Sequence, residues 1–238
     1  NKIMSRYCFD IETDNLLEEC TKVHCIVLKD IDTEKVLTLS VDEAIDKLTN
    51  AKLIIGHNII KFDIPVLEKL YNFKTKAEVF DTLVATRLIW SDLMESDMKR
   101  VHTKDFPRKL VNKHSLKAWG VRLGNYKQEF ETDWQEFTNE MLEYCVQDVE
   151  VTHNLYQIIL GKKYSKESLE LEPSVATLIS RQERYGVLFD KDPSLFFMLR
   201  KVNFEDLVTK ASKEACSFND TSDNNELGKI FDIELDVS

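Results

Sequence analysis

The sequence contains no long apolar run. None of its stretches approaches the roughly 18 consecutive apolar residues that a membrane-spanning helix requires, and no charged-then-apolar leader precedes a cleavage site of small residues. Cysteines are also few: there are five, an odd number, and their spacings match neither a zinc site nor a disulfide framework. We therefore expect a cytoplasmic protein with reduced thiols and no contact with a membrane.

Positive charge is scarce as well. The 238 residues include 32 Lys and Arg against 42 Asp and Glu, which gives a formal net charge of −10 at pH 7. A protein that coats nucleic acid would be basic, so this balance argues against that class. A polyanionic substrate would instead need metal ions or a local basic patch. The composition, 43% hydrophobic and 31% charged, is otherwise typical of a globular protein of one or two domains.

Extended and helical patterns alternate along the first part of the chain. The strand-like stretches are 7–11, 24–28, 36–39, 52–56 and 78–80. The first three follow one another as a meander, whereas the later ones alternate with helical patterns. This order predicts an α/β fold built on a mixed five-stranded sheet flanked by helices.

Helix starts and periodicity predict the remaining elements. The start signals are a capping box at Ser40 and Glu43 for a helix over 41–49, Pro65 in the first turn of a helix that reaches about residue 72, and Asp81 as the N-cap of a helix over 83–93. Further helices are predicted at 114–124, 138–160, 175–185 and 194–216, and one strand at 231–237. The charged stretch 91–113 is predicted as a surface loop and 161–168 as a linker.

Acidic side chains stand out in three segments that otherwise look buried. In YCFDIETDN, Asp10 and Glu12 are two residues apart and therefore share one face of a strand. Asp63 ends GHNIIKFD, where a buried strand gives way to a helix. Asp148 ends YCVQD and lies about one helical turn after Tyr144.

Four carboxylates that converge in a core need cations, because unpaired buried charge is very costly. Hard oxygen ligands suit Mg²⁺ or Mn²⁺, and two such ions about 4 Å apart are the standard device for in-line attack on a phosphodiester. Tyr144 would orient the attacking water or help to take its proton. The sequence thus predicts a two-metal phosphodiesterase with Asp10, Glu12, Asp63 and Asp148 as metal ligands.

The same three segments resemble the motifs of the DEDD exonuclease superfamily, tyrosine branch. They are D-I-E at 10–12, N-x-x-x-F-D at 58–63 and Y-x-x-x-D at 144–148. The histidine branch needs a histidine five residues before the last acid, where this sequence has Glu143. With FDTLVATRLIWSDL and HSLKAWGVRLG, the flanking stretches resemble the proofreading domain of family A DNA polymerases, in particular the phage replicative type.

This resemblance covers about residues 5–160, and ISRQERYGVLFD resembles the stretch that leads into the polymerase region. It implies an exonuclease domain with a ribonuclease H-like fold over 4–162 and a small helical C-terminal appendage over 163–238 that ends in an acidic tail. No polymerase core is included, so we expect no polymerase activity from this chain alone. The chain is then either an excised domain or a subunit that works with a separate family A polymerase.

The resemblance also implies the activity and the site. The implied activity is 3′→5′ removal of nucleotides from single-stranded or frayed DNA 3′ ends, with two Mg²⁺ ions for which Mn²⁺ can substitute. It would serve proofreading for a family A DNA polymerase in DNA replication, in the host cytoplasm if a phage encodes the chain. Asp10, Glu12 and Asp148 would hold the metal ions, with help from Asp63, often through water. Thr13 and Leu16 would contact the terminal nucleotide, Leu16 as an apolar wedge against its base. Asn58 would support the site or the substrate.

Alternative interpretations remain at this stage. A tyrosine-branch exoribonuclease would share the chemistry, and a catalytically inactive docking module of a replicase would share the fold. Taken alone, Asp63 is also explained as a helix N-cap and Tyr144 as a packing residue, while Asp81 is assigned to a cap. The basic residues between Lys99 and Lys113 are as well explained by a solvated surface as by a path for single-stranded DNA.

Overall fold

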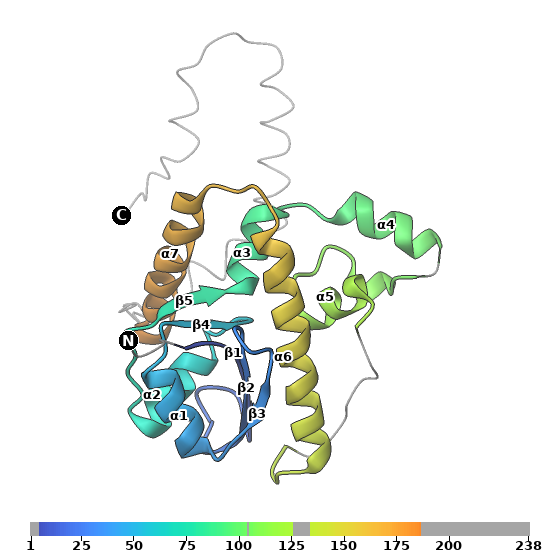
Figure 1. The fold of residues 1–238 in the computed structure, drawn as a ribbon. Helices are drawn as coiled ribbons and strands as arrows, with labels where there is room; N and C mark the ends of the chain where they lie inside the picture. Colours follow the sequence, from blue (N-terminus) through green and yellow to red (C-terminus); the bar gives the residue numbers. More distant parts are fainter. Residues whose placement is uncertain (1–4, 104, 126–133, 187–238) are drawn as a thin grey trace, which may run out of the picture. The chain divides into compact units, whose positions relative to one another are not determined.

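A mixed five-stranded sheet forms the centre of the protein, as the sequence predicts (Figure 1). In the computed structural model, which describes residues 5–103, 105–125 and 134–186, the strands are β1 (Arg6–Thr13), β2 (Val23–Asp30), β3 (Val36–Thr38), β4 (Leu53–Gly56) and β5 (Glu78–Asp81). Their order is β3-β2-β1-β4-β5. The β1–β2 and β2–β3 pairs are antiparallel, whereas β1–β4 and β4–β5 are parallel.

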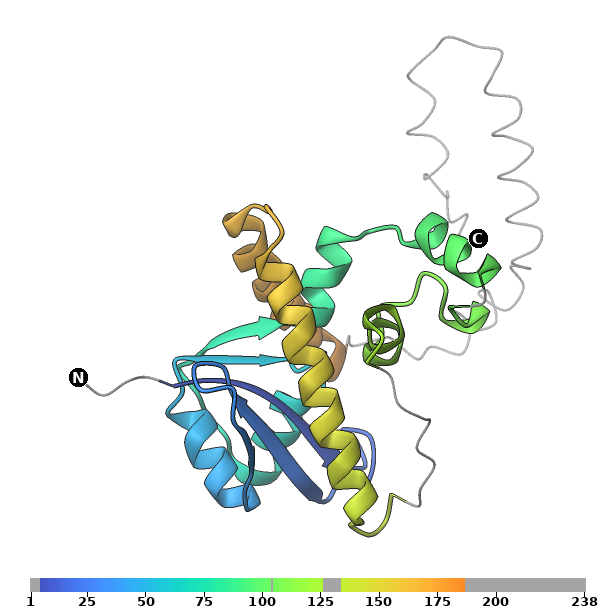
Figure 2. The same ribbon diagram turned by 45° about the vertical axis from the view of Figure 1, so that its right-hand side comes forward.

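Helices cover both faces of this sheet (Figures 1 and 2). They are α1 (Val41–Thr49), α2 (Asp63–Tyr71), α3 (Thr82–Ile89), α4 (Met94–His102), the 3₁₀ helix η1 (Arg108–Leu110), α5 (Leu116–Leu123), α6 (Asn139–Leu160) and α7 (Lys166–Tyr185). Helices α1 and α2 pack on one face of the sheet and α6 crosses the other, so the architecture has three layers.

Strand β1 is central, and its side chains alternate between the two layers. Tyr7, Phe9 and Ile11 are buried in the apolar cluster under α1 and α2, whereas Cys8 packs with Val149 of α6. Because side chains two residues apart point the same way, the acids at positions 10 and 12 face α6 with Cys8. The sheet itself therefore directs both carboxylates toward the long helix.

Local capping signals place several helix starts where the sequence predicts them. Ser40 accepts a hydrogen bond from the backbone N–H of Glu43, whose carboxylate accepts one from the Ser40 N–H, which completes the capping box. Ser115 caps α5, and Gly124 ends that helix with φ +73° in the left-handed region. Asp81 caps α3 by accepting from Leu83 and Val84 N–H groups.

The prediction for residues 83–113 is partly wrong. The helix over 83–93 ends at Ile89, and the stretch predicted as a loop contains α4 and η1. Contacts distant in sequence explain the difference, because Asp97 of α4 is 1% exposed and accepts hydrogen bonds from Arg122 at 2.7 and 3.0 Å. A helix held by a buried ion pair leaves little apolar periodicity in the sequence.

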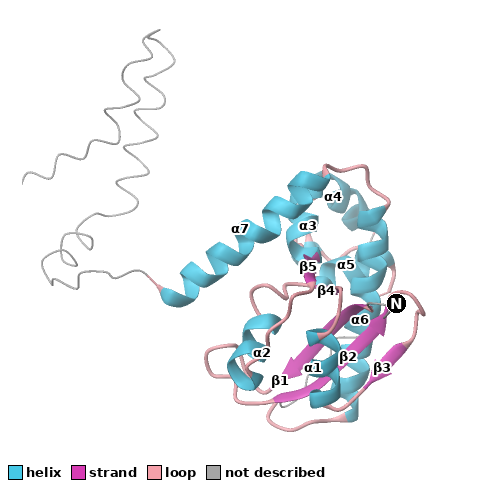
Figure 3. Cartoon of the chain, turned by 60° about the vertical axis from the view of Figure 1, so that its left-hand side comes forward, coloured by secondary structure: helices cyan, strands magenta, loops and turns pink. Residues whose placement is uncertain are grey.

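Helix α7 begins earlier than predicted. It starts at Lys166, within the stretch assigned to a linker, and Ser165 caps it by accepting from the Ser168 N–H. Pro173 lies inside the helix rather than before it. Figure 3 shows α7 as a long helix that passes α3 and β5, against which it packs. The domain boundary at 162/163 remains a prediction, and the described residues all fall in one compact unit that ends at Gly186.

Some predictions lie outside the described residues: the helix over 194–216, the strand over 231–237 and the acidic tail. Among the helices that are described, none combines the length and apolarity needed to cross a lipid bilayer.

Candidate active site

The C-terminal half of β1 and the N-terminal half of α6 meet at a cluster of acidic side chains. Asp10, Glu12 and Cys145 each place one possible ligand atom within 4.8 Å of the others. The Cys145 thiol lies 3.4 Å from the Asp10 carbonyl oxygen and 3.7 Å from its carboxylate Oδ2. Side chains 135 residues apart in sequence thus share one site because α6 packs directly on β1.

Helix α6 also contributes Tyr144 and Asp148. They are four residues apart and share one face of the helix, and the Tyr144 hydroxyl donates a hydrogen bond to the Asp148 carboxylate. Asp148 in turn lies close enough to Asp10 and Glu12 to affect the ionisation of both. The helical spacing read from the sequence therefore corresponds to a contact in the structure.

The loop between β4 and α2 delivers Asp63. Asn58 has φ +68°, a left-handed conformation that asparagine tolerates better than most residues, and its carbonyl oxygen accepts from the N–H groups of Lys61 and Phe62. The Asp81 carboxylate accepts from the N–H of Asn58 at 2.9 Å and of Ile60 at 3.1 Å. These bonds shape the turn that ends at Asp63.

The structure decides an open alternative for Asp63 and extends the assignment of Asp81. The alternative that Asp63 is a helix N-cap is excluded, because Phe62 occupies that position and no side chain caps α2 there. Asp63 is instead the first helical residue, 3% exposed, and its Oδ1 has no hydrogen-bond partner. Asp81 does cap α3, but it also holds the loop that carries Asn58, a role that its assignment as a simple cap did not include.

Burial raises the pKa of all four carboxylates, and in Asp10 and Glu12 the charges of the other site acids raise it further. Burial, followed by the charges of Asp63, Glu12 and Asp148, holds the pKa of Asp10 well above its ordinary range. Burial and the charge of Asp148 raise the pKa of Glu12 to about 9. Burial likewise raises the pKa of Asp63 and of Asp148 to about 7, in Asp148 against the opposing effect of the Tyr144 hydrogen bond. Ionisation of the site is therefore unfavourable unless positive charge is bound there.

The donor set fits a hard divalent cation. Carboxylate oxygens are the ligands that Mg²⁺ and Mn²⁺ prefer, and the unpartnered, buried Oδ1 of Asp63 is an oxygen that lacks the bond it needs. Cations would also offset the repulsion from the other site acids that raises the pKa of Asp10 and Glu12. The sequence alone did not assign Cys145 to the site, although it directly follows Tyr144 and precedes Asp148 by three residues.

Two of the predicted substrate contacts lie at the end of β1: Thr13 is its last residue, and Leu16 follows in the connection to β2. Thr13 is 8% exposed and donates a hydrogen bond to the Asn15 carbonyl oxygen at 2.8 Å. Leu16 is 74% exposed, which is unusual for a leucine beside a polar site. In contrast to Leu16, Trp119 is buried in a core with Leu155.

Two side chains of the basic stretch between Lys99 and Lys113 bind protein groups. Lys99 pairs with Glu95 at 2.7 Å, and the Arg100 guanidinium donates to the carbonyl oxygens of Val121 and Arg122. The Arg100 bonds join α4 to α5, whereas the Lys99–Glu95 pair lies within α4 and both of its side chains are largely exposed. The contacts favour a structural role for Arg100 over a path for nucleic acid.

Comparison with known families decides the relationship. The profile of the 3′-5′ exonuclease family of family A DNA polymerases matches residues 9–162, well over half of the chain. The chain belongs to this family. It is a 3′-5′ exonuclease of the DEDD type, and the tyrosine-branch prediction and the polymerase-type relationship are confirmed. The alternative of an inactive docking module is not supported.

The curated relatives of the exonuclease are phage DNA polymerases. It is 32% identical over 231 residues to the DNA-directed DNA polymerase of Escherichia phage T7, and equally to that of Enterobacteria phage T3. Each match covers 76% of this chain and 33% of the relative. The exonuclease therefore spans about a third of the length of these polymerases.

Solved structures agree on the fold. Brucella melitensis NrnC, in a structure bound to pGG, gives a TM-score of 0.55 at 18% identity over 81% of this chain and 93% of NrnC. NrnC with bound Mg²⁺ gives 0.52 at 19% identity over the same shares. The predicted ribonuclease H-like α/β fold is confirmed.

Proposed function

We propose that this exonuclease is a Mg²⁺-dependent 3′→5′ exodeoxyribonuclease that removes nucleotides from single-stranded or frayed DNA 3′ ends. One observation carries the proposal. Asp63 of α2 and Asp148 of α6 lie close enough to Asp10 and Glu12 of β1 to raise the pKa of both, and Tyr144 donates a hydrogen bond to Asp148. The similarity to the DNA polymerases of phages T7 and T3 favours DNA over RNA as the substrate of this chain.

We assign each residue a catalytic role from its position in the site. Asp10, Glu12 and Asp148 would hold two Mg²⁺ ions, for which Mn²⁺ can substitute, and Asp63 would add a ligand, often through water. When bound, the ions make the attacking water more acidic and stabilise the leaving oxygen. Tyr144, whose hydroxyl bonds Asp148, orients that water or assists its deprotonation.

The substrate end would reach these acids from the side of the β1–β2 connection. Leu16 offers an exposed apolar surface to the terminal base, Thr13 contacts the terminal nucleotide, and Asn58 supports the site from the adjacent loop. A 3′ end must be unpaired to reach buried carboxylates, so single strands and frayed ends are favoured. A family A polymerase domain or subunit is the proposed partner, in the host cytoplasm if a phage encodes the chain.

RNA is the second candidate substrate. It is favoured by the likeness to NrnC, whose structure bound to pGG shows the same fold with a short oligonucleotide. The acids would act on either sugar, since the chemistry is at the phosphate. Discrimination between DNA and RNA would instead depend on contacts to the terminal nucleotide.

Digestion of matched strands tests both proposals. A 20-mer of DNA and its RNA counterpart, each labelled at the 5′ end, are incubated with the exonuclease in Mg²⁺ or EDTA. We expect a ladder that shortens from the 3′ end, faster for DNA, and absent in EDTA. Asp10→Ala removes a proposed ligand, and Asp42→Ala changes an exposed acid of α1 as the matched control. Equal rates for wild type and Asp10→Ala would reject the catalytic assignment, and faster RNA cleavage would select the second candidate.

A further inference from the structure

The connection between β1 and β2, residues 14–22, is a tightly bonded turn that we call the Leu16 loop. The Asp14 carboxylate accepts from the N–H groups of Thr21 and Lys22, both at 3.0 Å. The Leu16 carbonyl oxygen accepts from the N–H groups of Glu19 and Cys20 at 3.0 and 2.8 Å. The loop therefore has a defined shape although Leu16 at its tip is 74% exposed.

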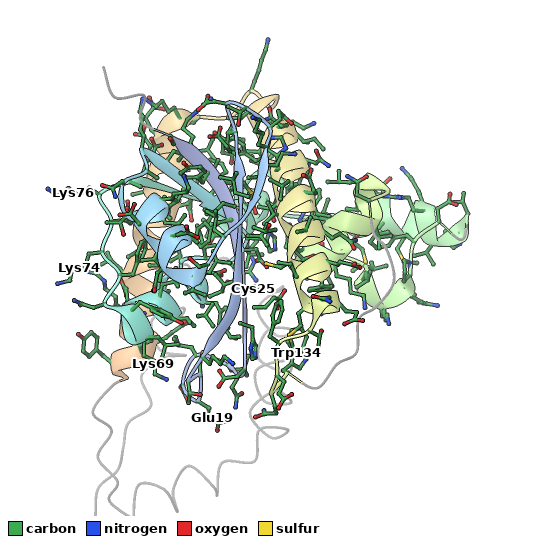
Figure 4. All side chains as sticks on the ribbon, turned by 60° about the horizontal axis from the view of Figure 1, so that its bottom comes forward. Glu19, Cys25, Lys69, Lys74, Lys76 and Trp134 are labelled. Atoms are coloured by element: carbon green, nitrogen blue, oxygen red, sulfur yellow. The ribbon has the colours of Figure 1, made fainter. Side chains whose placement is uncertain are left out.

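Lys69 of α2 holds this loop through hydrogen bonds. Its ammonium group donates to three carbonyl oxygens of the loop: Leu17 at 2.9 Å, Glu18 at 2.8 Å and Cys20 at 2.9 Å. An ammonium has three N–H bonds, so all of its donors are used. Figure 4 labels Lys69 and Glu19 on the same side of the molecule. Among the described residues, no other hydrogen bond ends on these three oxygens.

The hydrogen bonds of Lys69 connect α2, which begins at Asp63, to the Leu16 loop, which follows β1. Helix α2 begins at Asp63 and carries Lys69 six residues later, about 9 Å along the helix axis. The Leu16 loop leaves β1 immediately after Glu12 and Thr13. Leu16 is thus fixed relative to the carboxylates from both sides, through β1 and through the bonds of Lys69 to the loop.

We propose that Lys69 is a positioning residue that holds Leu16 rigidly beside the carboxylates and thereby lets the exonuclease open paired 3′ ends. This inference rests on the proposed function, and it adds a residue from outside the three acidic motifs. An apolar side chain can replace base stacking only if it stays in place when the terminal pair opens. A loop free to move would have to be ordered at each encounter, which lowers the share of productive complexes.

The kinetic test compares two substrates that differ only in pairing: a single strand and the same strand fully paired at its 3′ end. Lys69→Met keeps the aliphatic stem and removes the three donors. We expect kcat/KM on the paired end to fall about tenfold, the loss that one charge-assisted hydrogen bond implies, while the single strand stays within about twofold. Lys69→Arg keeps donors for the carbonyl oxygens and should restore most of the paired-end activity.

Two further variants make the test specific. Leu16→Ala should lower kcat/KM on the paired end more than on the single strand, and Lys69→Met should add no further loss to it on the paired end, because both changes remove the same fixed apolar contact with the terminal base. Lys74→Met is the matched control: Lys74 is exposed and, in Figure 4, extends away from the body of the protein. An equal loss on both substrates, or losses of Lys69→Met and Leu16→Ala that multiply, would overturn the proposal.

Hydrogen exchange separates this inference from the proposed function. We expect the backbone amides of a peptide that spans residues 14–22 to exchange several-fold faster in Lys69→Met and unchanged in Lys74→Met. This measurement needs no nuclease activity. Unchanged exchange in Lys69→Met rejects the role of Lys69, whereas faster exchange in a chain that digests no DNA rejects the proposed function alone.

Discussion

Removing the charge of Asp63 should stabilise the metal-free exonuclease at alkaline pH. Asp63 is 3% exposed, and burial raises its pKa from 3.8 to about 7. A carboxyl with a raised pKa costs the folded state nothing below its ordinary pKa, and the cost grows as the pH rises from 3.8 to about 7. Above that pH the cost is complete. Asp63→Asn keeps the size of the side chain and removes this dependence.

The size of the effect follows from the same values. A pKa raised from 3.8 to about 7 corresponds to about 4 kcal/mol at pH 8, and to less than about 1 kcal/mol at pH 4. The new amide brings donors into a site where Oδ1 already lacks a partner, at a cost of about 1–3 kcal/mol. We therefore expect Asp63→Asn to gain about 1–3 kcal/mol at pH 8 and to gain nothing at pH 4.

Urea unfolding in EDTA at the two pH values measures this difference. Asp97→Asn is the matched control, because burial opposes its ionisation but hydrogen bonds from Arg122 and the Asn112 N–H hold its pKa below the ordinary value. That variant should lose stability at pH 8. Added Mg²⁺ should stabilise wild type more than Asp63→Asn. A less stable Asp63→Asn at pH 8, or the same gain at pH 4, would refute the reasoning.

Three further outcomes are expected. Tyr144→Phe should lower the rate of nucleotide release about 100-fold without changing the unfolding midpoint, as single-turnover digestion and urea titration would show. Lys29→Met should cost about 2–3 kcal/mol in urea unfolding, because the buried ammonium bonds Glu150 at 2.7 and 2.9 Å; an unchanged midpoint would contradict this. Gly56→Ala should cost about 3 kcal/mol, measured in the same way, since a Cβ there would overlap the fully buried Ile59 side chain.

The sheet and the grouping of the acids were predictable because they depend on local periodicity. Alternation along β1 assigns Asp10 and Glu12 to one face, and a spacing of four assigns Tyr144 and Asp148 to one face of α6. Both assignments describe the structure. The capping box at Ser40 was readable for the same reason, since all of its groups lie within four residues.

Contacts between distant segments explain what the sequence left undecided. Helix α4 is stabilised by an ion pair with α5, 25 residues away, and Cys145 reaches Asp10 across 135 residues. Lys69 meets the Leu16 loop at separations of 49 to 52 residues. Repeating patterns along the chain reveal which face of an element a side chain occupies. They contain nothing about which other element lies against that face, because that depends on how the layers pack.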